Sequence, residues 1–599
     1  MCGITGCVGQ TDAAADIMRG LQNLEYRGYD SAGLAVRNGA GIEVFKQSGE
    51  VGNLRKHVGG RAPLGHIAIG HTRWSTHGPP TDANAHPHVD CTGTVAVVHN
   101  GIINNYDSLR ERLRTAGHVF TSDTDTEVVP HLIERYLSKG HSPETAFRRA
   151  LDELEGSYAL AVLIGKEDTL YAARSGSPLV LGIGESVTYL ASDVPAFLEF
   201  TDQVVYLDDG DVAIIQPDDY RLTDREGTPV SRPVRTVDWV PEDAEKGGYD
   251  HFMLKEIHEQ PMTLRQTVRG RVVDGHAKLD DLSDDALAGI ESVHLVGCGT
   301  SYHASLSGVA QLNALGVPAQ AALASEYATN PLPIDDHTLV VGVTQSGETA
   351  DTLAALRVAK AAGARTLAFT NVIGSTAARE CDEALFIRAG PEIGVAATKT
   401  FSSQVAALWL LADRISGGKS DPKLMAAVDD LPALVERVIA RSNAKAVVEA
   451  FCPNDAYFFI GRHHCYPVAL EGALKFKEIT YEHAEGFAGG ELKHGPLALV
   501  TEDTPVFAVF SGDEATDEKL LGNVEEVQAR GAPVIAVAPE RATAVAETAD
   551  VVLTVPDTHP VVTPVLANVQ LQLVAYYAAV ALDRAIDKPR NLAKSVTVE

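Results

Sequence analysis

The strongest constraint on the fold is a strand–loop–helix pattern that occurs twice in the second half of the 599-residue chain. VHLVGCGTSYHASL begins at Val293, and AYFFIGRHHCYPVALEGALKFKEIT matches it about 163 residues later. LVVGVTQSGETADTLAALRVAK, from Leu339, is echoed after about 166 residues by TPVFAVFSGDEATDEKLLGNVEEVQARG. Strands that alternate with helices require a parallel sheet covered by helices. Because the period is too long for a solenoid, we expect a tandem duplication of one doubly wound α/β subdomain.

The first ~220 residues have a different rhythm, with short apolar runs separated by Gly, Asp and Asn. Strands are expected within 66–74, 94–102, 158–165 and 204–215, and helical periodicity occupies 105–116 and 126–138. Many short strands with few helices predict an α+β domain of packed sheets.

The domain boundaries follow from these changes of pattern, because a chain of this length exceeds what one hydrophobic core can bury. After Ile215 the sequence becomes polar and irregular through PVRTVDWVPEDAEKGGYDHF, which reads as a linker. The expected parts are an N-terminal domain (2–220), a linker with connecting helices (221–284), two α/β subdomains (285–425 and 447–589) and a C-terminal tail (590–599).

The amino-acid composition limits the classes of partner and the cellular compartment that we expect for this chain. A net charge of −30 argues against nucleic-acid binding, although backbone N–H groups can hold one phosphate inside an acidic protein. The seven cysteines are few and scattered, as in a reducing cytoplasm. Val565 to Leu582 is the most apolar segment, but Asn568, Gln570 and Gln572 interrupt it, so we expect a buried helix there. With no signal peptide in the sequence, the protein is expected to be cytoplasmic, with neither membrane nor nucleic acid as partner.

Cys2 is a candidate nucleophile at the start of the chain. A small second residue permits removal of Met1, which would leave a thiol and a free α-amine on one residue. An α-amine has a pKa near 8 and can act as general base for the adjacent thiol.

Several motifs accompany Cys2 in a fixed order. They are CGI, LEYRGYDSAG (24–33), GHTRWSTHG (70–78), NAHPH (84–88), HNGIINN (99–105) and SDTDTE (122–127). Together they closely resemble the class II glutamine amidotransferases of the N-terminal-nucleophile fold. The resemblance implies two antiparallel sheets between helix layers, with Cys2 at the end of a buried strand and L-glutamine as substrate.

Hydrolysis of glutamine through a thioester needs donors for a tetrahedral oxyanion and a pocket for an α-carboxylate and an α-ammonium. The resemblance assigns the oxyanion donors to Asn100 and Gly101. Arg73 can bind the carboxylate in bidentate fashion, and Asp125 can receive the ammonium, although an aspartate at a helix start is more often a cap. The remaining implied glutamine contacts are Trp74, Thr76 and His77.

No metal site is predicted. Five histidines of the first domain are candidate ligands, but they lack a compact ligand spacing with a cysteine or carboxylate set; they are His71, His77, His86, His88 and His99. Cys7 and Cys91 are expected to be buried and inert.

In the second half, the loops after two strands are rich in hydroxyl groups. They are Gly299-Thr300-Ser301 and Thr344-Gln345-Ser346-Gly347-Glu348-Thr349. VGCGTS fails the dinucleotide pattern because its third glycine position holds Tyr302. Each loop opens a predicted helix, where free N–H groups favour an anion. One such loop would more often be a helix cap, but two neighbouring loops indicate a phosphate without a nucleoside.

These loops and the repeat resemble the sugar isomerase (SIS) domain family. The motifs are CGTSY, QSGETADT, EIGVAATK, EGALKFKEI, GELKHGPLAL and DKPRNLAKSVTVE. Joined to an amidotransferase half, they imply the conversion of D-fructose 6-phosphate to D-glucosamine 6-phosphate. The implied sugar-binding residues are Thr300, Ser301, Thr344, Gln345, Ser346, Thr349 and Val395; Thr344 stands where serine is common.

Glu471, Lys475 and Glu478 are four and three residues apart, so they can share one helix face near the sugar. The resemblance makes Glu478 the base that moves a proton from C1 to C2. It makes His494 the ring-opening acid/base, contributed by the neighbouring subunit of a homodimer, and Lys594 the lysine that forms a Schiff base. Acid–base and imine chemistry need neither a cofactor nor a metal.

Two other functions stay open on the sequence. An amidotransferase with another acceptor would need a phosphoribosyl- or ATP-binding second half, which the tandem SIS pattern disfavours. A sugar-phosphate sensor with decayed catalysis is disfavoured by the joint presence of Cys2, Glu478, His494 and Lys594.

Overall fold

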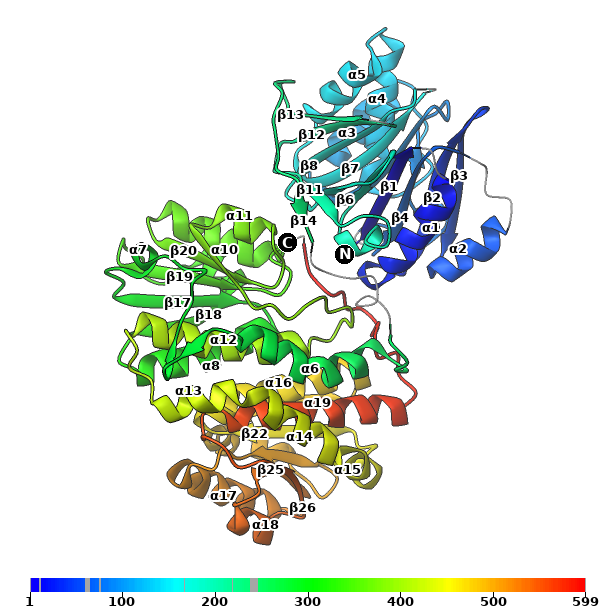
Figure 1. Cartoon of the computed structure of the whole chain (residues 1–599). Coiled ribbons are helices and arrows are strands. Elements are labelled where there is room, and N and C mark those ends of the chain that lie inside the picture. Colours follow the sequence, from blue (N-terminus) through cyan, green and yellow to red (C-terminus); the bar gives the residue numbers. More distant parts are fainter. Residues whose placement is uncertain are drawn as a thin grey trace. The chain divides into compact units, whose positions relative to one another are not determined.

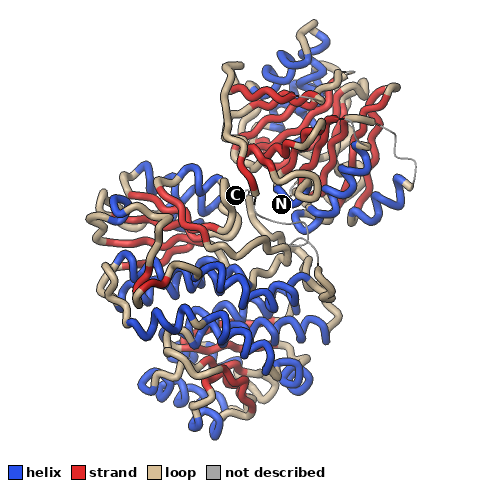
Figure 2. The backbone as a smooth tube through the Cα atoms, viewed as in Figure 1, coloured by secondary structure: helices blue, strands red, loops and turns tan. Residues whose placement is uncertain are grey.

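A computed structural model describes residues 2–9, 12–59, 65–74, 77–165, 167–217, 219–237 and 246–597. The chain divides into two compact units (Figures 1 and 2). The first holds residues 1–245 together with 593–599, and the second holds Lys246–Leu592.

The first unit contains two antiparallel sheets. One has the order β14-β11-β9-β10-β1-β4-β2-β3, and the other β13-β12-β8-β7-β6-β5. The strands of the first sheet are β1 (Gly3–Gly9), β2 (Ser31–Asn38), β3 (Gly41–Ser48), β4 (Ile67–Arg73), β9 (Val180–Ile183), β10 (Val187–Ala191), β11 (Gln203–Tyr206) and β14 (Arg235–Thr236). Those of the second are β5 (His88–Val89), β6 (Val95–Ile103), β7 (Gly156–Ile164), β8 (Leu170–Ser175), β12 (Val212–Gln216) and β13 (Asp219–Thr223).

The two sheets pack face to face through alternate apolar residues, as period-two strands require. Ile4 of β1, Ile69 of β4 and Val98 of β6 belong to this shared core. The outer face of the second sheet packs against α3 (Tyr106–Thr115), α4 (Val128–Ser138) and α5 (Pro143–Leu151). On the other sheet, α1 (Ala13–Asn23) contacts β1 and β4, and α2 (Val51–Val58) contacts β3. The predicted sandwich between helix layers is confirmed.

The local predictions for this unit are confirmed except after Ile215. The runs at 66–74, 94–102 and 158–165 form β4, β6 and β7, and the two helical periods form α3 and α4. The expectation of irregular chain after Ile215 was wrong for β13, which pairs with β12 from Val212 to Gln216. Polar residues can occupy this strand because it lies at the edge of its sheet and its solvent face needs no apolar side chains.

The second unit contains two five-stranded parallel sheets with the same topology, β18-β17-β19-β20-β21 and β23-β22-β24-β25-β26. The first sheet comprises β17 (Ser292–Gly297), β18 (Ala319–Leu323), β19 (Thr338–Val343), β20 (Arg365–Thr370) and β21 (Glu383–Phe386). The second comprises β22 (Ala456–Gly461), β23 (His483–Ala488), β24 (Val506–Val509), β25 (Val534–Pro539) and β26 (Val551–Val555). A small hairpin joins β15 (Val272–Val273) to β16 (His276–Ala277). The predicted pair of doubly wound subdomains is confirmed.

Long helices pack together between the two parallel sheets (Figure 1). They are α6 (Phe252–Val268), α8 (Thr300–Ala314), α12 (Lys399–Ile415), α14 (Leu431–Arg441), α16 (Tyr466–Thr480) and α19 (Thr563–Ala581). The remaining helices are α7 (Asp284–Leu287), α9 (Ala324–Thr329), α10 (Ala350–Ala361), α11 (Thr376–Glu380), α13 (Pro422–Asp429), α15 (Ala444–Phe451), α17 (Glu514–Gln528) and α18 (Thr543–Thr548). Among the described residues, α19 alone is long and apolar enough to cross a membrane, but 83% of its apolar window is buried. The prediction of a buried core helix there is confirmed.

Candidate active sites

Cys2 lies immediately before β1, a strand that is buried along its whole length. Its thiol contacts the backbone of Trp74, the residue that directly follows β4. The Trp74 amide nitrogen lies 3.2 Å from Cys2 Sγ, and the Trp74 carbonyl oxygen lies 3.4 Å from it. Burial raises the pKa of the Cys2 thiol, partly offset by the nearby guanidinium groups of Arg73 and Arg27. The resting thiol is therefore protonated at neutral pH and needs a base to become a nucleophile.

Asn100 approaches Cys2 from the facing sheet. Its Nδ2 donates to the Cys2 carbonyl oxygen at 2.9 Å, and its Oδ1 lies 3.0 Å from Nε2 of His71. The same His71 nitrogen lies 3.0 Å from the His99 carbonyl oxygen. Burial lowers the pKa of His71 to about 3, so the ring is neutral. Since Nε2 faces two acceptors, it carries the proton, and this fixes the orientation of the Asn100 amide.

Gly101 follows Asn100 with a backbone conformation that favours glycine, at φ 128°. A Cβ at this position would lie 2.0 Å from the Ser157 carbonyl oxygen on β7. The close approach of β6 to β7 therefore requires glycine.

Arg73 and Asp125 are both buried, and Arg73 interacts electrostatically with Cys2 as well as with Asp125. Arg73 donates to the carbonyl oxygens of His77, Gly78 and Pro79, so its guanidinium holds the loop that follows β4. Burial lowers the pKa of Arg73, while Cys2, Asp30 and Asp125 act in the opposite direction. Asp125 Oδ2 accepts from the Ile103 amide at 2.9 Å rather than capping its own 3-10 turn, Asp125–Glu127.

Two other glutamine contacts expected from the sequence, Trp74 and His77, belong to the segment that follows β4. The Trp74 ring packs edge-on against Tyr29 at 5.5 Å, and His77 packs edge-on against Tyr106 at 5.3 Å. Thr76 lies outside the described residues. Cys7 is buried as expected, but the same expectation was wrong for Cys91, which is exposed in the turn between β5 and β6.

In the second unit, the two hydroxyl-rich loops follow β17 and β19, which are neighbours in one parallel sheet. Helix α8 begins at Thr300, and α10 begins directly after Thr349. Because parallel strands end at the same edge, the loops lie side by side at the ligand-binding edge typical of such sheets. Thr344 Oγ1 lies 3.2 Å from Thr349 Oγ1 and accepts from the Gly347 amide at 3.2 Å, which orders the second loop.

The other sugar contacts expected from the sequence have identifiable partners. Ser301 Oγ accepts from Gln404 Nε2 at 3.0 Å, and Ser346 Oγ accepts from the Glu348 amide at 3.1 Å. The Gln345 carbonyl oxygen accepts from the backbone N–H of Asn371 at 3.1 Å. Val395 is buried, and its amide donates to the Asp587 carbonyl oxygen at 3.1 Å.

A buried ionic cluster connects the two halves of this unit. Glu471 and Lys475 of α16 are almost fully buried, and Lys475 Nζ lies 3.5 Å from Glu471 and 2.5 Å from Glu478. The shared helix face predicted from their spacing is confirmed. Glu471 also accepts from Thr300 Oγ1 at 3.0 Å and lies 2.8 Å from His303 Nδ1, both on α8. Burial lowers the pKa of Lys475, but Glu478 and Glu471 outweigh it and raise the pKa overall, so the amine stays charged.

His494 and Lys594 are the remaining residues that the sequence predicts at the sugar site. His494 ends the 3-10 segment Gly489–His494 and is exposed. Lys594 is half-buried in the tail that groups with the first unit. No helix or strand occurs in the described part of that tail.

The sequence reasoning missed three residues that fix parts of the two sites: His71 and Glu392, which are buried, and His303, which is half-buried. His71 sets the Asn100 amide, His303 binds Glu471, and Glu392 accepts from the amides of Thr398 and Thr400 at 2.9 and 3.1 Å. His71 lies in the motif GHTRW and Glu392 in the motif EIGVAATK, and this position within a motif was the sign in the sequence that they have a role at the sites. For His303 there was none, because its partner lies on a helix far along the chain.

Comparisons with known proteins agree with both halves. A glutamine amidotransferase domain model matches residues 71–199, and a SIS domain model matches twice, at 286–414 and 452–582. The glutamine–fructose-6-phosphate aminotransferase [isomerizing] of Halobacterium salinarum is 52% identical, and that of Symbiobacterium thermophilum 49%, each over all of both chains. The C-terminal domain of the glucosamine-fructose-6-phosphate aminotransferase from Francisella tularensis superimposes with a TM-score of 0.55 at 37% identity, covering 58% of this chain and all of that domain. The chain thus belongs to the family of isomerizing glutamine–fructose-6-phosphate aminotransferases.

Proposed function

We propose that this chain hydrolyses L-glutamine at Cys2 and uses the ammonia to convert D-fructose 6-phosphate to D-glucosamine 6-phosphate, the first step of amino-sugar biosynthesis. The observation that carries the proposal is the Asn100 amide, oriented by a neutral His71 and held 2.9 Å from the Cys2 backbone. An amide donor fixed beside a nucleophilic thiol is the arrangement that amide hydrolysis requires. Family membership supplies the sugar half.

At the glutamine site, the Cys2 α-amine, freed by removal of Met1, takes the thiol proton as Sγ attacks the side-chain amide carbon. The developing oxyanion is held by the Asn100 side chain and the Gly101 amide. Arg73 and Asp125 bind the substrate carboxylate and ammonium, with Trp74, Thr76 and His77 around them. Ammonia leaves as the thioester forms, and water then releases glutamate.

At the sugar site, the two hydroxyl-rich loops hold the phosphate and the sugar hydroxyls. Lys475 stays charged between two carboxylates and so serves in binding, while the motif match assigns imine formation to Lys594. Glu478 moves the proton between C1 and C2, and His494 from a neighbouring subunit opens the ring. Lys594 condenses with the C2 carbonyl of the open-chain sugar and releases water. Ammonia then displaces the lysine at C2, and the shift of a proton from C1 to C2 gives the amino sugar.

We assign glutamine hydrolysis to the N-terminal domain expected from the sequence, residues 2–220. We assign the sugar reaction to the two α/β subdomains, residues 285–425 and 447–589. The steps need acid–base and imine chemistry, so no cofactor is required. A cross-subunit His494 calls for a homodimer, and soluble substrates fit a cytoplasmic enzyme.

The decisive experiment is Cys2→Ala assayed for two outputs, glutamine hydrolysis and isomerisation of fructose 6-phosphate. Hydrolysis should disappear while isomerisation persists, and Cys381→Ala, which removes a half-buried thiol of the second unit, should spare both. Loss of both activities in a folded Cys2→Ala protein would contradict two separate sites.

Lys594→Arg should have the reverse effect, because arginine keeps the charge but forms no Schiff base at neutral pH. Borohydride trapping with fructose 6-phosphate should label the wild type and Lys477→Arg, which changes an exposed lysine of α16, but not Lys594→Arg. Labelling of Lys594→Arg would place the imine on another lysine.

A further inference from the structure

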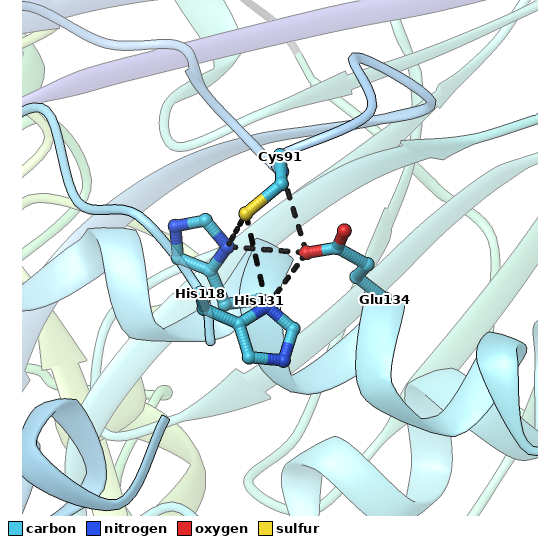
Figure 3. A group of neighbouring side chains, drawn as sticks. All are labelled: Cys91, His118, His131 and Glu134. Carbon is cyan, nitrogen blue, oxygen red and sulfur yellow. Dashed lines mark hydrogen bonds and ion pairs between the residues drawn. The ribbon is translucent and has the colours of Figure 1, made fainter. Parts of the chain in front are cut away.

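Four side chains with metal-binding atoms come together in the first unit, at positions in the chain far from Cys2. Cys91, His118, His131 and Glu134 each offer one ligand atom, and all four atoms lie within 4.8 Å of one another (Figure 3). Cys91 belongs to the turn between β5 and β6, His118 follows α3, and the other two lie one helical turn apart on α4. Nothing in the proposed reaction uses them.

Three separations between the ligand atoms lie within about 0.3 Å of the edges of a tetrahedral zinc site, and a fourth is shorter. Cys91 Sγ lies 3.8 Å from Nδ1 of His118 and 3.6 Å from Nδ1 of His131, against ~3.5 Å expected from Zn–S and Zn–N bonds of about 2.3 and 2.0 Å. Glu134 Oε2 lies 3.3 Å from His131 Nδ1, against an expected ~3.4 Å. It lies 2.8 Å from His118 Nδ1, an edge that would lengthen by about 0.5 Å around an ion.

Neighbouring groups supply the outer contacts that metal ligands usually have. The Val119 amide donates to Cys91 Sγ at 3.4 Å. The far nitrogen of His131, Nε2, lies 3.8 Å from Glu127 Oε1. Glu127 is itself fixed by the amides of Thr121 and Ser122 at 2.7 Å each. A carboxylate therefore lies within ion-pair distance of the second ring nitrogen, while Nδ1 faces the other three ligands.

Burial is graded across the cluster. The His131 side chain is 1% exposed, His118 and Glu134 are 12% and 15% exposed, and Cys91 opens to solvent. The ion can therefore enter from the side of Cys91, and the buried His131 ring closes the inner side of the site.

We propose that Cys91, His118, His131 and Glu134 bind one Zn²⁺ per chain. A thiolate with two imidazoles and one carboxylate is a donor set that zinc prefers over magnesium or calcium. Four protein ligands leave no open position, so the ion is structural. It ties the β5–β6 turn and the segment after α3 to the start of α4.

The test uses the full-length protein, stripped with a chelator and reloaded with Zn²⁺ alone. Elemental analysis should give one zinc per chain in the wild type. Competition with a chromophoric chelator should show at least a tenfold loss of affinity in Cys91→Ser and in His131→Gln. Cys381→Ser and His141→Gln, which change a cysteine and a histidine outside the cluster, should bind zinc as the wild type does.

Replacing zinc by Co²⁺ reports the ligands directly. The wild type and Cys2→Ala should show the visible bands of tetrahedral cobalt and a thiolate-to-cobalt charge-transfer band, and Cys91→Ser should lose the latter. If the histidine variant fails to fold, Glu134→Gln, which keeps shape and size, should still weaken binding. Zinc content well below one per chain, or content and cobalt spectra unchanged in the cluster variants, would overturn the proposal in favour of a metal-free hydrogen-bonded cluster.

Discussion

The two candidate sites differ in the buried side chains that hold their expected catalytic residues in place. In the first unit, buried histidines are kept neutral: burial lowers the pKa values of His71, His86, His88 and His99. In the second unit, Lys475 remains charged between Glu471 and Glu478. Neutral rings can orient an amide by hydrogen bonding alone, whereas a buried charge must be matched by other charges. We therefore expect different substitutions and solution conditions to destabilise the two units.

The largest expected effect is that of Lys475→Met, which leaves two carboxylates of α16 without their cation. Breaking a buried ion pair in this way costs about 3–5 kcal/mol. Urea unfolding followed by circular dichroism should show the second unit destabilised, with glutamine hydrolysis retained. Lys477→Met, a change to an exposed lysine on the same helix, is the control and should be near neutral. Equal destabilisation by both variants would contradict a special role for the buried amine.

Acid should weaken the first unit. The folded-state pKa of His71 is about 3, below the ordinary value of 6.5, so the unfolded chain binds the extra proton first. The stability that the neutral ring contributes is present above pH 6.5 and is lost as pH falls toward 3, on the order of 3 kcal/mol by pH 4. Unfolding measured at pH 7, 6 and 5, with proteolytic fragments assigned to each unit, should show the first unit weakening. His71→Gln should flatten this dependence, and an unchanged slope would argue against the buried neutral ring.

Gly101→Ala should destabilise the first unit by about 1–3 kcal/mol, because the added methyl group meets the Ser157 carbonyl and the backbone has a positive φ. Gly117→Ala shares the positive φ but has open space around it, and so isolates the steric part. Thermal unfolding of both variants provides the measurement. A Gly101→Ala protein no weaker than Gly117→Ala would mean that β6 and β7 separate easily here.

The smallest expected effect is that of His71→Phe, which removes the donor that orients Asn100. The kcat of glutamine hydrolysis should fall about 10- to 100-fold, less than the 10²- to 10³-fold typical of losing an oxyanion donor itself, as in Asn100→Ala. Sugar isomerisation should be unchanged, and His71→Gln should restore part of kcat. His66→Gln, an exposed neighbour, is the control. A change in KM alone would point to a binding role instead.

The sequence by itself determined the fold class, the duplication and the shared face of Glu471, Lys475 and Glu478. These properties follow from local periodicity: strands repeat every two residues, helices every 3.6, and spacings of three and four stay on one face. The motifs around Cys2 and in the two SIS subdomains indicated the family, and each of them is likewise a short local stretch of sequence. The polar edge strand β13 was missed because solvent on one face removes the apolar signal.

Only the tertiary structure decided which distant residues meet. His71 and Asn100 come from facing sheets, and His303 and Glu471 come from helices in different halves of the second unit. The same holds for Cys91, expected to be inert, which joins His118, His131 and Glu134 across three segments with no compact spacing in the chain. Contacts between segments depend on how sheets and helices pack, and packing depends on the whole buried surface rather than on any local pattern.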